Sequence, residues 1–184
     1  RRMRFIGDGV RVDDSDMHDS LKPFQRHIVK WACKNGRAAV WADTGLGKTR
    51  MQIEWCRLMA ETSIIIAPLA VAHQTVEEAA KIGVTAKYVR SPEQITGAGL
   101  YVVNYEMLGK FDPRMFGAVA LDEASILKQS DGKTRSMLIE WAETIRYKTA
   151  WTATPAPNDP EELTNQAEFL GIMKRVNMLA AYYV

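Results

Sequence analysis

A glycine-rich segment at residues 42–49 has the clearest chemical potential in the sequence. It reads Ala-Asp-Thr-Gly-Leu-Gly-Lys-Thr. A turn built from Thr44, Gly45, Leu46 and Gly47 lets backbone N–H groups converge on the phosphates of a nucleotide, and the amino-terminus of a following helix favours the same negative charge. The two residues that end the segment, Lys48 and Thr49, would then reach the β- and γ-phosphates and ligate Mg²⁺, respectively.

Two adjacent carboxylates follow an apolar run further along the chain. The run Ala118–Leu121 is short enough to be a buried strand, and Asp122 and Glu123 come directly after it. In an NTPase with such a glycine-rich loop, a carboxylate at a strand end holds the metal, and a second group orients the attacking water. We therefore expect Asp122 on the Mg²⁺ side and Glu123 beside the water. Together with the glycine-rich turn, the pair predicts binding of ATP and Mg²⁺ and phosphoryl transfer to water.

Length and composition restrict the class of protein. The chain has 184 residues, enough for one well-filled domain, and its 47% apolar and 25% charged residues are ordinary for a globular protein. A net charge of +2 permits a polyanionic partner without requiring one. The cysteines, Cys33 and Cys56, fit neither a zinc pattern nor a disulfide framework, which favours a reducing compartment. No stretch has the ~20 apolar residues of a membrane span, so we expect a cytoplasmic protein with no membrane partner.

Short apolar runs alternate with amphipathic stretches along most of the chain. The runs predict strands at 38–41, 63–67, 86–89, 100–103, 118–121 and 148–151. The amphipathic stretches predict helices at about 21–34, 48–60, 71–82, 134–145 and 160–170. This alternation is typical of an α/β domain whose mostly parallel central sheet carries helices on both faces. Because sites in such sheets lie at the carboxyl ends of the strands, the glycine-rich turn and the Asp-Glu pair should share one edge.

The amino-terminal part carries its own predictions. Residues 3–12 suggest a small hairpin, and residues 13–19 suggest an acidic, solvated linker. Ser20 can cap the first helix, which should stop at Asn35-Gly36. We expect the apolar residues of this helix to face inward, and we expect all five tryptophans to lie in the core. The expected inward residues are Leu21, Phe24, Ile28 and Trp31, and the tryptophans are at positions 31, 41, 55, 141 and 151.

Six ordered stretches resemble the motifs of one enzyme family. They are Leu21–Gln25, Ala42–Thr49, Ala67–Leu69, Asn104–Glu106, Asp122–Ser125 and Thr152–Pro155. In this order they resemble the Q-motif, the P-loop, motifs Ia and Ib, the Asp-Glu-Ala-His box and motif III of superfamily-2 helicases, in the first RecA-like domain. The continuation Ile126-Leu127-Lys128 is similar to Swi/Snf-type DNA translocases. The short spacings suggest a prokaryotic or phage protein, active in the cytoplasm of a prokaryotic or phage-infected cell.

The resemblance assigns roles to residues outside the glycine-rich turn. It implies that the Gln25 amide recognises adenine, a task that suits a group able both to donate and to accept a hydrogen bond. It implies nucleic-acid contacts, most simply with double-stranded DNA, along two further stretches and the continuation of the acidic box. The implied contact residues are Pro68, Leu69, Asn104, Tyr105 and Lys128.

Three residues are expected to couple the ATP site to the nucleic-acid site. The resemblance gives this role to Ser125, Thr152 and Thr154. In the family a histidine stands at the position of Ser125. Because a serine hydroxyl is shorter and has no charge near neutral pH, we expect this link to be weaker or to pass through water.

A larger departure concerns the second half of the motor. Superfamily-2 ATPases use a second RecA-like domain with arginine fingers, and after Thr154 the only arginine here is Arg175. We therefore divide the chain into 1–19 (hairpin and linker), 20–172 (RecA-like ATP-binding domain) and 173–184 (start of a connection to a second domain in cis), and expect it to be nearly inactive alone. Two other hypotheses remain open: an ATP-dependent binding module without motor activity, and a P-loop kinase.

Overall fold

A six-stranded, wholly parallel sheet forms the centre of the molecule. The structure is a computed structural model that describes residues 8–129, 132–153, 160–174 and 176–178. The strand order is β1-β6-β5-β2-β4-β3, and every neighbouring pair is parallel. The strands are β1 (Arg37–Trp41), β2 (Thr62–Ala67), β3 (Ala86–Tyr88), β4 (Gly99–Asn104), β5 (Ala118–Leu121) and β6 (Tyr147–Thr152). The predicted α/β class and all six strands are confirmed.

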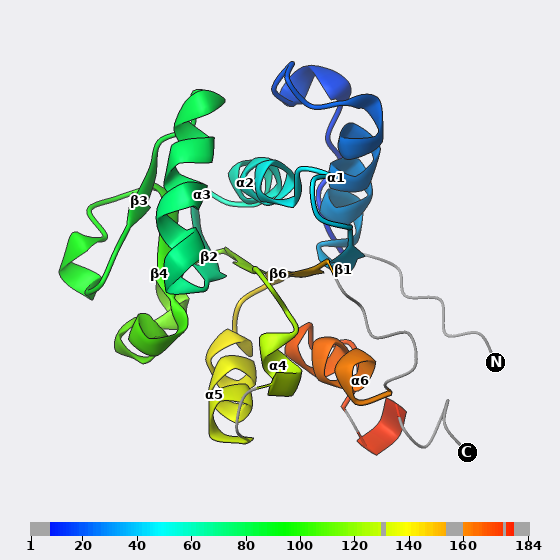
Figure 1. The fold of residues 1–184 in the computed structure, drawn as a ribbon, viewed down its shortest axis with the longest axis vertical. Coiled ribbons are helices and arrows are strands. Elements are labelled where there is room, and N and C mark those ends of the chain that lie inside the picture. Colours follow the sequence, from blue (N-terminus) through cyan, green and yellow to red (C-terminus); the bar gives the residue numbers. More distant parts are fainter. Residues whose placement is uncertain (1–7, 130–131, 154–159, 175, 179–184) are drawn as a thin grey trace.

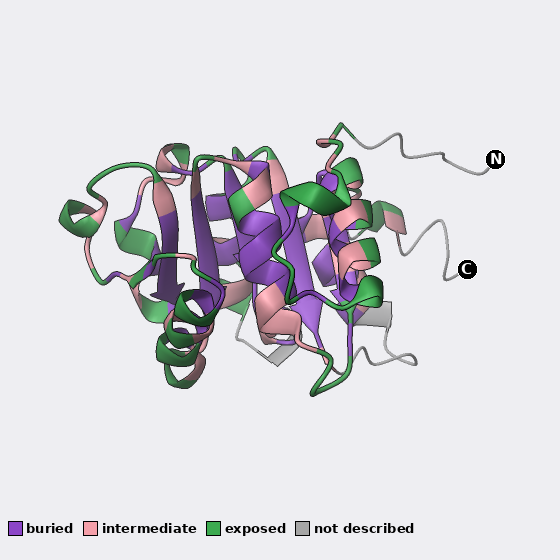
Figure 2. Cartoon of the chain, turned by 90° about the horizontal axis from the view of Figure 1, so that it is seen from above, coloured by how far each residue is buried: buried purple, intermediate pink, exposed green. Residues whose placement is uncertain are grey.

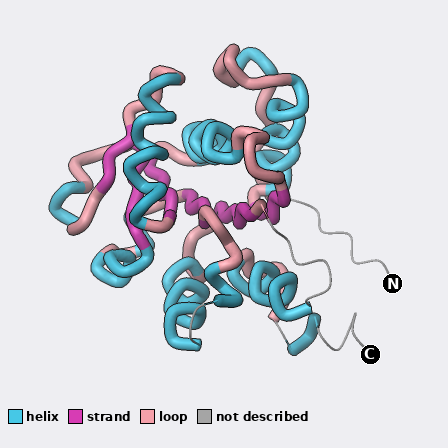
Figure 3. Tube along the Cα trace, viewed as in Figure 1, coloured by secondary structure: helices cyan, strands magenta, loops and turns pink. Residues whose placement is uncertain are grey.

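Helices cover both faces of this sheet. Figure 1 shows one group of helices on one side and a second group on the other, and Figure 3 shows the sheet between them. The first group is α1 (Pro23–Asn35), α2 (Lys48–Met59) and α3 (Leu69–Lys81). The second is α4 (Ile126–Gln129), α5 (Gly132–Ala142) and α6 (Pro160–Phe169). Short 3₁₀ helices occupy Asp14–Asp16, Pro92–Gln94, Tyr105–Lys110 and Pro113–Met115. No helix of the described residues is long and apolar enough to cross a membrane.

The sheet divides the interior into two cores. Because both faces of each central strand are covered, the strands are continuous apolar runs rather than alternating ones. In β2, for example, Ile65 packs into one core while Ile64 and Ile66 pack into the other, and all three are completely buried. Figure 2 shows the buried strands enclosed by helices whose outer surfaces are exposed.

Strand register brings the predicted functional segments to one edge. Trp41, the last residue of β1, pairs with Thr152, the last residue of β6. One strand further, Leu121 of β5 pairs with Ala150 of β6. The segments that follow β1, β5 and β6 therefore leave the sheet side by side, as expected for sites in parallel sheets.

The buried face of α1 differs from the one predicted. Leu21 is buried, just before the helix, but Phe24 and Trp31 are 41% and 47% exposed. The helix turns a different stripe inward, at the i, i+4, i+7 and i+8 spacing of an α-helix; its members are Gln25, Val29, Ala32 and Cys33. Trp41 is also 50% exposed, so the prediction that all tryptophans are core residues is wrong for Trp31 and Trp41 and confirmed for the other three.

The segment before α1 is largely exposed, as predicted for residues 13–19, but it is anchored to the domain at several points. Of the predicted hairpin, residues 3–7 lie outside the described residues, and residues 10–12 are not in a strand; the Val10 N–H donates instead to the carbonyl of Cys33 at 2.8 Å. Met17 is buried within the acidic stretch. The His18 N–H donates to Oε1 of the fully buried Glu54 at 2.8 Å.

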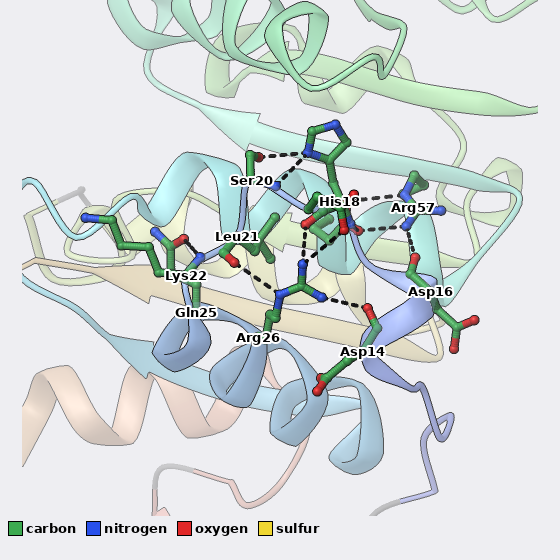
Figure 4. Close-up of polar contacts among 11 residues, drawn as sticks. Asp14, Asp16, His18, Ser20, Leu21, Lys22, Gln25, Arg26 and Arg57 are labelled. Atoms are coloured by element: carbon green, nitrogen blue, oxygen red, sulfur yellow. Dashed lines mark hydrogen bonds and ion pairs between the residues drawn. The ribbon is translucent and has the colours of Figure 1, made fainter.

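Arg26 fixes the path of this segment from the helix side. Figure 4 shows its guanidinium donating to the carbonyls of Asp14, His18 and Leu21, at 2.7, 3.1 and 3.1 Å. Arg57 reaches the segment from α2 and donates to the carbonyl of Asp16. These bonds satisfy backbone groups that would otherwise need water, so the segment is part of the folded domain.

The predicted end of α1 at Asn35-Gly36 is confirmed, and it gives a test of stability. Gly36 has φ +69°, and a Cβ there would lie 3.1 Å from Cδ1 of Tyr147 and 3.2 Å from Cα of Gly9. We expect Gly36→Ala to lower the free energy of unfolding, measured with urea, by more than the ~1–2 kcal/mol that a left-handed conformation costs. Gly83→Ala is the matched control, because Gly83 has φ +70° and nothing within 4 Å of its Cβ position. Equal losses for the two variants would contradict an additional packing cost at Gly36.

Candidate nucleotide site

The glycine-rich turn lies between β1 and the first turn of α2. Gly45 and Gly47 have φ values of +83° and +80°, which side chains rarely adopt, so both positions need glycine. The Asp43 carboxylate steadies the turn by accepting from the Thr44 N–H at 2.7 Å and from its hydroxyl at 3.3 Å. Gly47 is the amino-terminal cap of α2, so the positive end of the helix dipole lies at the turn.

Lys48 opens α2 and turns back over the loop. Its Nζ donates to the carbonyl of Ala42 at 3.0 Å, with a longer contact to the carbonyl of Asp43. No carboxylate of the described residues forms an ion pair with it. Thr49 follows on the same turn and is partly exposed. Backbone carbonyls thus hold the amine, and it is open to pairing with an incoming phosphate.

Gln25 joins α1 to the glycine-rich turn. Its Nε2 donates to the carbonyl of Leu46 at 2.8 Å, and its Oε1 accepts from the N–H of Lys22 at 2.8 Å. The predicted neighbourhood of Gln25 and the turn is thus present in the structure, although the two residues are far apart in sequence. An amide has two donor hydrogens and two acceptor lone pairs, so each end of the side chain keeps one position for a further partner.

Asp122 lies at the end of β5 in a buried, polar setting. Gln52 of α2 donates to its Oδ1 at 2.7 Å, and Tyr105 donates from its hydroxyl to its backbone carbonyl at 2.5 Å. Burial is the main cause that raises the pKa of Asp122, and the hydrogen bond from Gln52 opposes it. Burial, followed by the Asp122 charge, also raises the pKa of Tyr105. The carboxylate is thus costly to ionise until a cation compensates it.

Glu123 has the unusual backbone that redirects the chain after β5. Its φ of +53° is the only positive value among the described non-glycine residues. Its Oε1 accepts from the Ser125 hydroxyl at 2.8 Å and from the Thr152 hydroxyl at 3.3 Å. The neighbouring Ala124 N–H donates to the Trp151 carbonyl at 2.7 Å, which ties the turn to β6. A non-glycine residue is held in this conformation only where surrounding contacts demand it.

In the structure Ser125 is connected to Thr152 through Glu123, while the strength of the expected coupling stays a prediction. A serine was expected to make a weaker link, or one that passes through water. Ser125 and Thr152 donate directly to the same carboxylate oxygen of Glu123, so the Ser125–Thr152 connection runs through the acid itself. The third residue of the expected coupling set, Thr154, lies outside the described residues.

The residues predicted to contact nucleic acid fall into two groups. Pro68 and Leu69 begin α3 at the carboxyl edge of the sheet, and Leu69 is 53% exposed. Asn104 and Tyr105 are instead buried and bonded internally, since Asn104 accepts from the Tyr88 hydroxyl at 2.8 Å and Tyr105 supports Asp122. Lys128 lies in α4. The geometry therefore makes Asn104 and Tyr105 supports of the edge rather than parts of its outer surface.

One residue at the site, Gln52, had not been predicted, and Tyr105 had been predicted in a different role. Gln52 contacts Asp122 directly, and its place four residues after Lys48, on the same helix face, is the sequence signal that could have identified it. The supporting role of Tyr105 depends on the path of the 3₁₀ helix that follows β4, and no local pattern indicates it.

The residues present fit a magnesium–nucleotide complex. Lys48 and the start of α2 supply positive charge, while Asp122 supplies a buried carboxylate whose ionised form needs a cation. Oε1 of Gln52, beside Asp122, is buried and has no hydrogen-bond partner in the described structure. A buried amide oxygen of this kind is normally satisfied, and a water molecule on the metal would satisfy it.

The fold and site geometry together define the class. A six-stranded parallel sheet with helices on both faces, carrying the glycine-rich turn after β1, is the RecA-like fold of helicase cores. The neighbours among solved structures are SWI2/SNF2 and other superfamily-2 helicase cores, which confirms the predicted resemblance at the level of the fold.

Three solved structures illustrate the similarity. The Sulfolobus solfataricus SWI2/SNF2 ATPase core, solved in complex with dsDNA, has a TM-score of 0.77 and 20% identity, over 93% of this chain and 40% of that chain. The UvsW helicase of bacteriophage T4 has a TM-score of 0.67 and 16% identity, over 90% and 62%. The Hef helicase domain of Pyrococcus furiosus has a TM-score of 0.67 and 17% identity, over 85% and 39%.

Sequence comparison finds distant relatives in a phage, an animal and a plant. Protein p41 of Acyrthosiphon pisum secondary endosymbiont phage 1 is 29% identical over 81% of this chain, and mouse DNA annealing helicase and endonuclease ZRANB3 is 27% identical over 92%. Arabidopsis thaliana protein CHROMATIN REMODELING 19 is 24% identical over 90%. The chain spans 38%, 17% and 27% of these relatives, respectively. No protein-family model matches the chain.

Proposed function

We propose that this chain is the ATP-binding N-terminal motor domain of a DNA helicase or translocase, which couples ATP hydrolysis to movement on nucleic acid. One observation carries the proposal: Lys48, Asp122 and Glu123 follow two strands of one sheet edge, and Glu123 is bonded to both Ser125 and Thr152. An ATP site alone would need only Lys48, Asp122 and Glu123. The additional link to β6 is what a motor needs to transmit the state of the γ-phosphate.

The charged residues divide the work of binding. Lys48 and the start of α2 neutralise the β- and γ-phosphates, and Gln25 recognises the adenine while it holds the turn through Leu46. When bound, Mg²⁺ would be held by Thr49 and Asp122 and would offset the phosphate charge. Gln52 keeps the Asp122 carboxylate in place throughout.

Glu123 performs the proton chemistry in this proposal. Its carboxylate orients a water molecule for in-line attack on the γ-phosphate and accepts a proton from it. Ser125 and Thr152 hold one carboxylate oxygen, which leaves the other for the water. Because both hydroxyls donate to the same oxygen, a change in the charge of Glu123 alters their bonds at once, and that change reaches the end of β6.

Duplex DNA is the proposed partner. The solved SWI2/SNF2 core to which this chain is similar was crystallised with dsDNA, and Pro68 and Leu69 offer an exposed surface at the carboxyl edge of the sheet. Lys128, on the other side of the sheet, would add a phosphate contact. Asn104 and Tyr105, which are buried, would support this edge of the sheet without contacting the DNA.

The experiment is ATP hydrolysis with and without duplex DNA. An arginine finger from a second RecA-like domain is worth about 10³–10⁵ in rate, so we expect this chain alone to bind ATP but to turn over far below about 1 per second. Joining it to a second RecA-like domain with an arginine motif should restore DNA-stimulated turnover. Turnover of about 1 per second by the chain alone would refute the half-motor proposal. ATP-dependent DNA binding without any restored turnover would favour the binding module instead.

A further inference from the structure

A pocket of about 960 Å³ lies at the end of the sheet opposite the nucleotide site. It opens where β1 and β6 begin, between α5 and the residues that follow α6. Its charged residues are of both signs. The cations are Arg37, Arg135, Lys148 and Lys174, and the carboxylates are Glu140, Glu143 and Glu168. None of these residues serves the proposed ATPase site.

Lys148 is the buried cation of this pocket. It is 2% exposed, and its Nζ has only two long contacts, each of 3.4 Å, to the carbonyls of Glu143 and Phe169. No carboxylate of the described residues lies within ion-pair distance of it. A buried ammonium is normally paired because its desolvation is costly, so this lysine lacks the partner that its burial calls for.

Arg37 places a second cation beside it. Its guanidinium donates to the carbonyls of Arg146 and Gly171, at 3.0 and 3.3 Å, and no ion pair is found for it among the described residues. Gly171, with φ +65°, lies against both cations. A Cβ on Gly171 would lie 2.8 Å from Nη1 of Arg37, which is a clash, and 3.7 Å from Nζ of Lys148. Both cations thus line the same part of the pocket wall, and the absence of a side chain at Gly171 leaves them uncrowded.

The electrostatics of the pair agree with this geometry. Burial, followed by the charge of Arg37, lowers the pKa of Lys148 to about 8, while the Glu143 carboxylate acts weakly in the opposite direction. Two like charges near each other destabilise each other, and a shared anion would relieve both.

We propose that this pocket binds the oxyanion group, carboxylate or phosphate, of a small molecule, held between Arg37 and Lys148. An arginine fork and a lysine ammonium side by side offer several charge-assisted donors, which suits a group with two or three equivalent oxygens. The carboxylates of α5 and α6 on the pocket walls would accept hydrogen bonds from the remainder of the ligand. The site is separate from the ATP site and would survive the loss of ATP binding.

Calorimetric titration with inorganic phosphate and with malonate tests the proposal. The parent protein for these titrations carries Lys48→Ala, so that binding of phosphate at the glycine-rich turn is strongly weakened. We expect both anions to bind, and Lys148→Met and Arg37→Gln each to weaken binding about tenfold or more. Lys34→Gln, which changes an exposed lysine of α1, is the matched control and should leave the affinity unchanged. If only one anion binds, that anion identifies the ligand group.

Measuring malonate affinity as a function of pH separates the contribution of the Lys148 charge from that of the other charged groups. Below a pKa of about 8 the amine is charged, and above it the amine is neutral, so malonate should bind more weakly at about pH 9.5 than at pH 7. Malonate is fully ionised over this range. The other charged groups that face the pocket are present in both proteins compared; they are Arg37, Arg135, Lys174, Glu140, Glu143 and Glu168. Lys148→Met should remove most of this pH dependence. Absence of binding by both anions, or unchanged affinity in Arg37→Gln and Lys148→Met, would overturn the proposal; Arg37→Gln alone suffices if the lysine variant does not fold.

Discussion

Replacing Lys48 with alanine is expected to weaken ATP binding by about 10²–10³-fold and to abolish hydrolysis in the two-domain protein. The amine is the one cation that the structure places over the turn, held by the Ala42 carbonyl and by no carboxylate. Its loss leaves the phosphate charge to the backbone N–H groups and the helix dipole alone. Titration with a fluorescent ATP analogue measures the affinity, and phosphate release measures the rate.

The result is meaningful only if the fold is intact. Lys34→Ala serves as the control, because this lysine is exposed near the end of α1 and remote from the turn. Thermal unfolding of the Lys48→Ala protein should be close to that of the parent without nucleotide, and ATP should raise the melting temperature of the parent only. Equal ATP affinities in the parent and the Lys48→Ala protein would remove the glycine-rich turn from the mechanism.

Replacing Glu123 with glutamine is expected to separate binding from chemistry. The amide keeps the size of the side chain but cannot accept a proton from water, so hydrolysis should fall by about 10²–10⁴-fold. ATP affinity should change little, because the phosphates are held by Lys48 and the start of α2. Single-turnover hydrolysis in the two-domain protein, together with nucleotide titration, measures the two quantities separately.

Ser125→Ala and Thr152→Val test the connection through Glu123. Each removes one hydroxyl that donates to its Oε1, so hydrolysis should fall less than in Glu123→Gln, while stimulation by DNA should be lost. The two losses should not add when the substitutions are combined, because both act on one carboxylate oxygen. Normal DNA stimulation in both single variants would show that the coupling takes another route.

The sheet could be predicted from sequence because its strands are continuous runs of apolar residues. Runs such as Ile64–Ile66 have no amphipathic period, and burial on both faces requires that pattern. The edge that carries the site follows from the parallel arrangement. The strand order does not follow, because pairing of β1 with β6 depends on contacts between distant parts of the chain.

The first helix shows where local patterns mislead. Its large apolar residues Phe24 and Trp31 were assigned to the core, but smaller residues and Gln25 face inward. Hydrophobicity alone ranks tryptophan above alanine and cysteine, whereas close packing of α1 on α2 favours small side chains. The shared position of Lys48 and Asp122 at one sheet edge could be predicted, because each follows a parallel strand directly, and their roles stay predictions. The site was predicted poorly where a residue supports another, as with Gln52 and Tyr105.

The position of β6 between β1 and β5 has a consequence for folding. The glycine-rich turn and the Asp-Glu pair are each made locally, but they become one site only when the strand that includes Lys148 inserts between Arg37 and Ala118. Bringing β1 and β6 together closes a long loop of chain. Such closure is slow, because the chain loses conformational entropy before stabilising contacts form. If the chain binds ATP as proposed, we expect ATP affinity to report completion of the whole sheet, and ATP to protect the entire domain from unfolding.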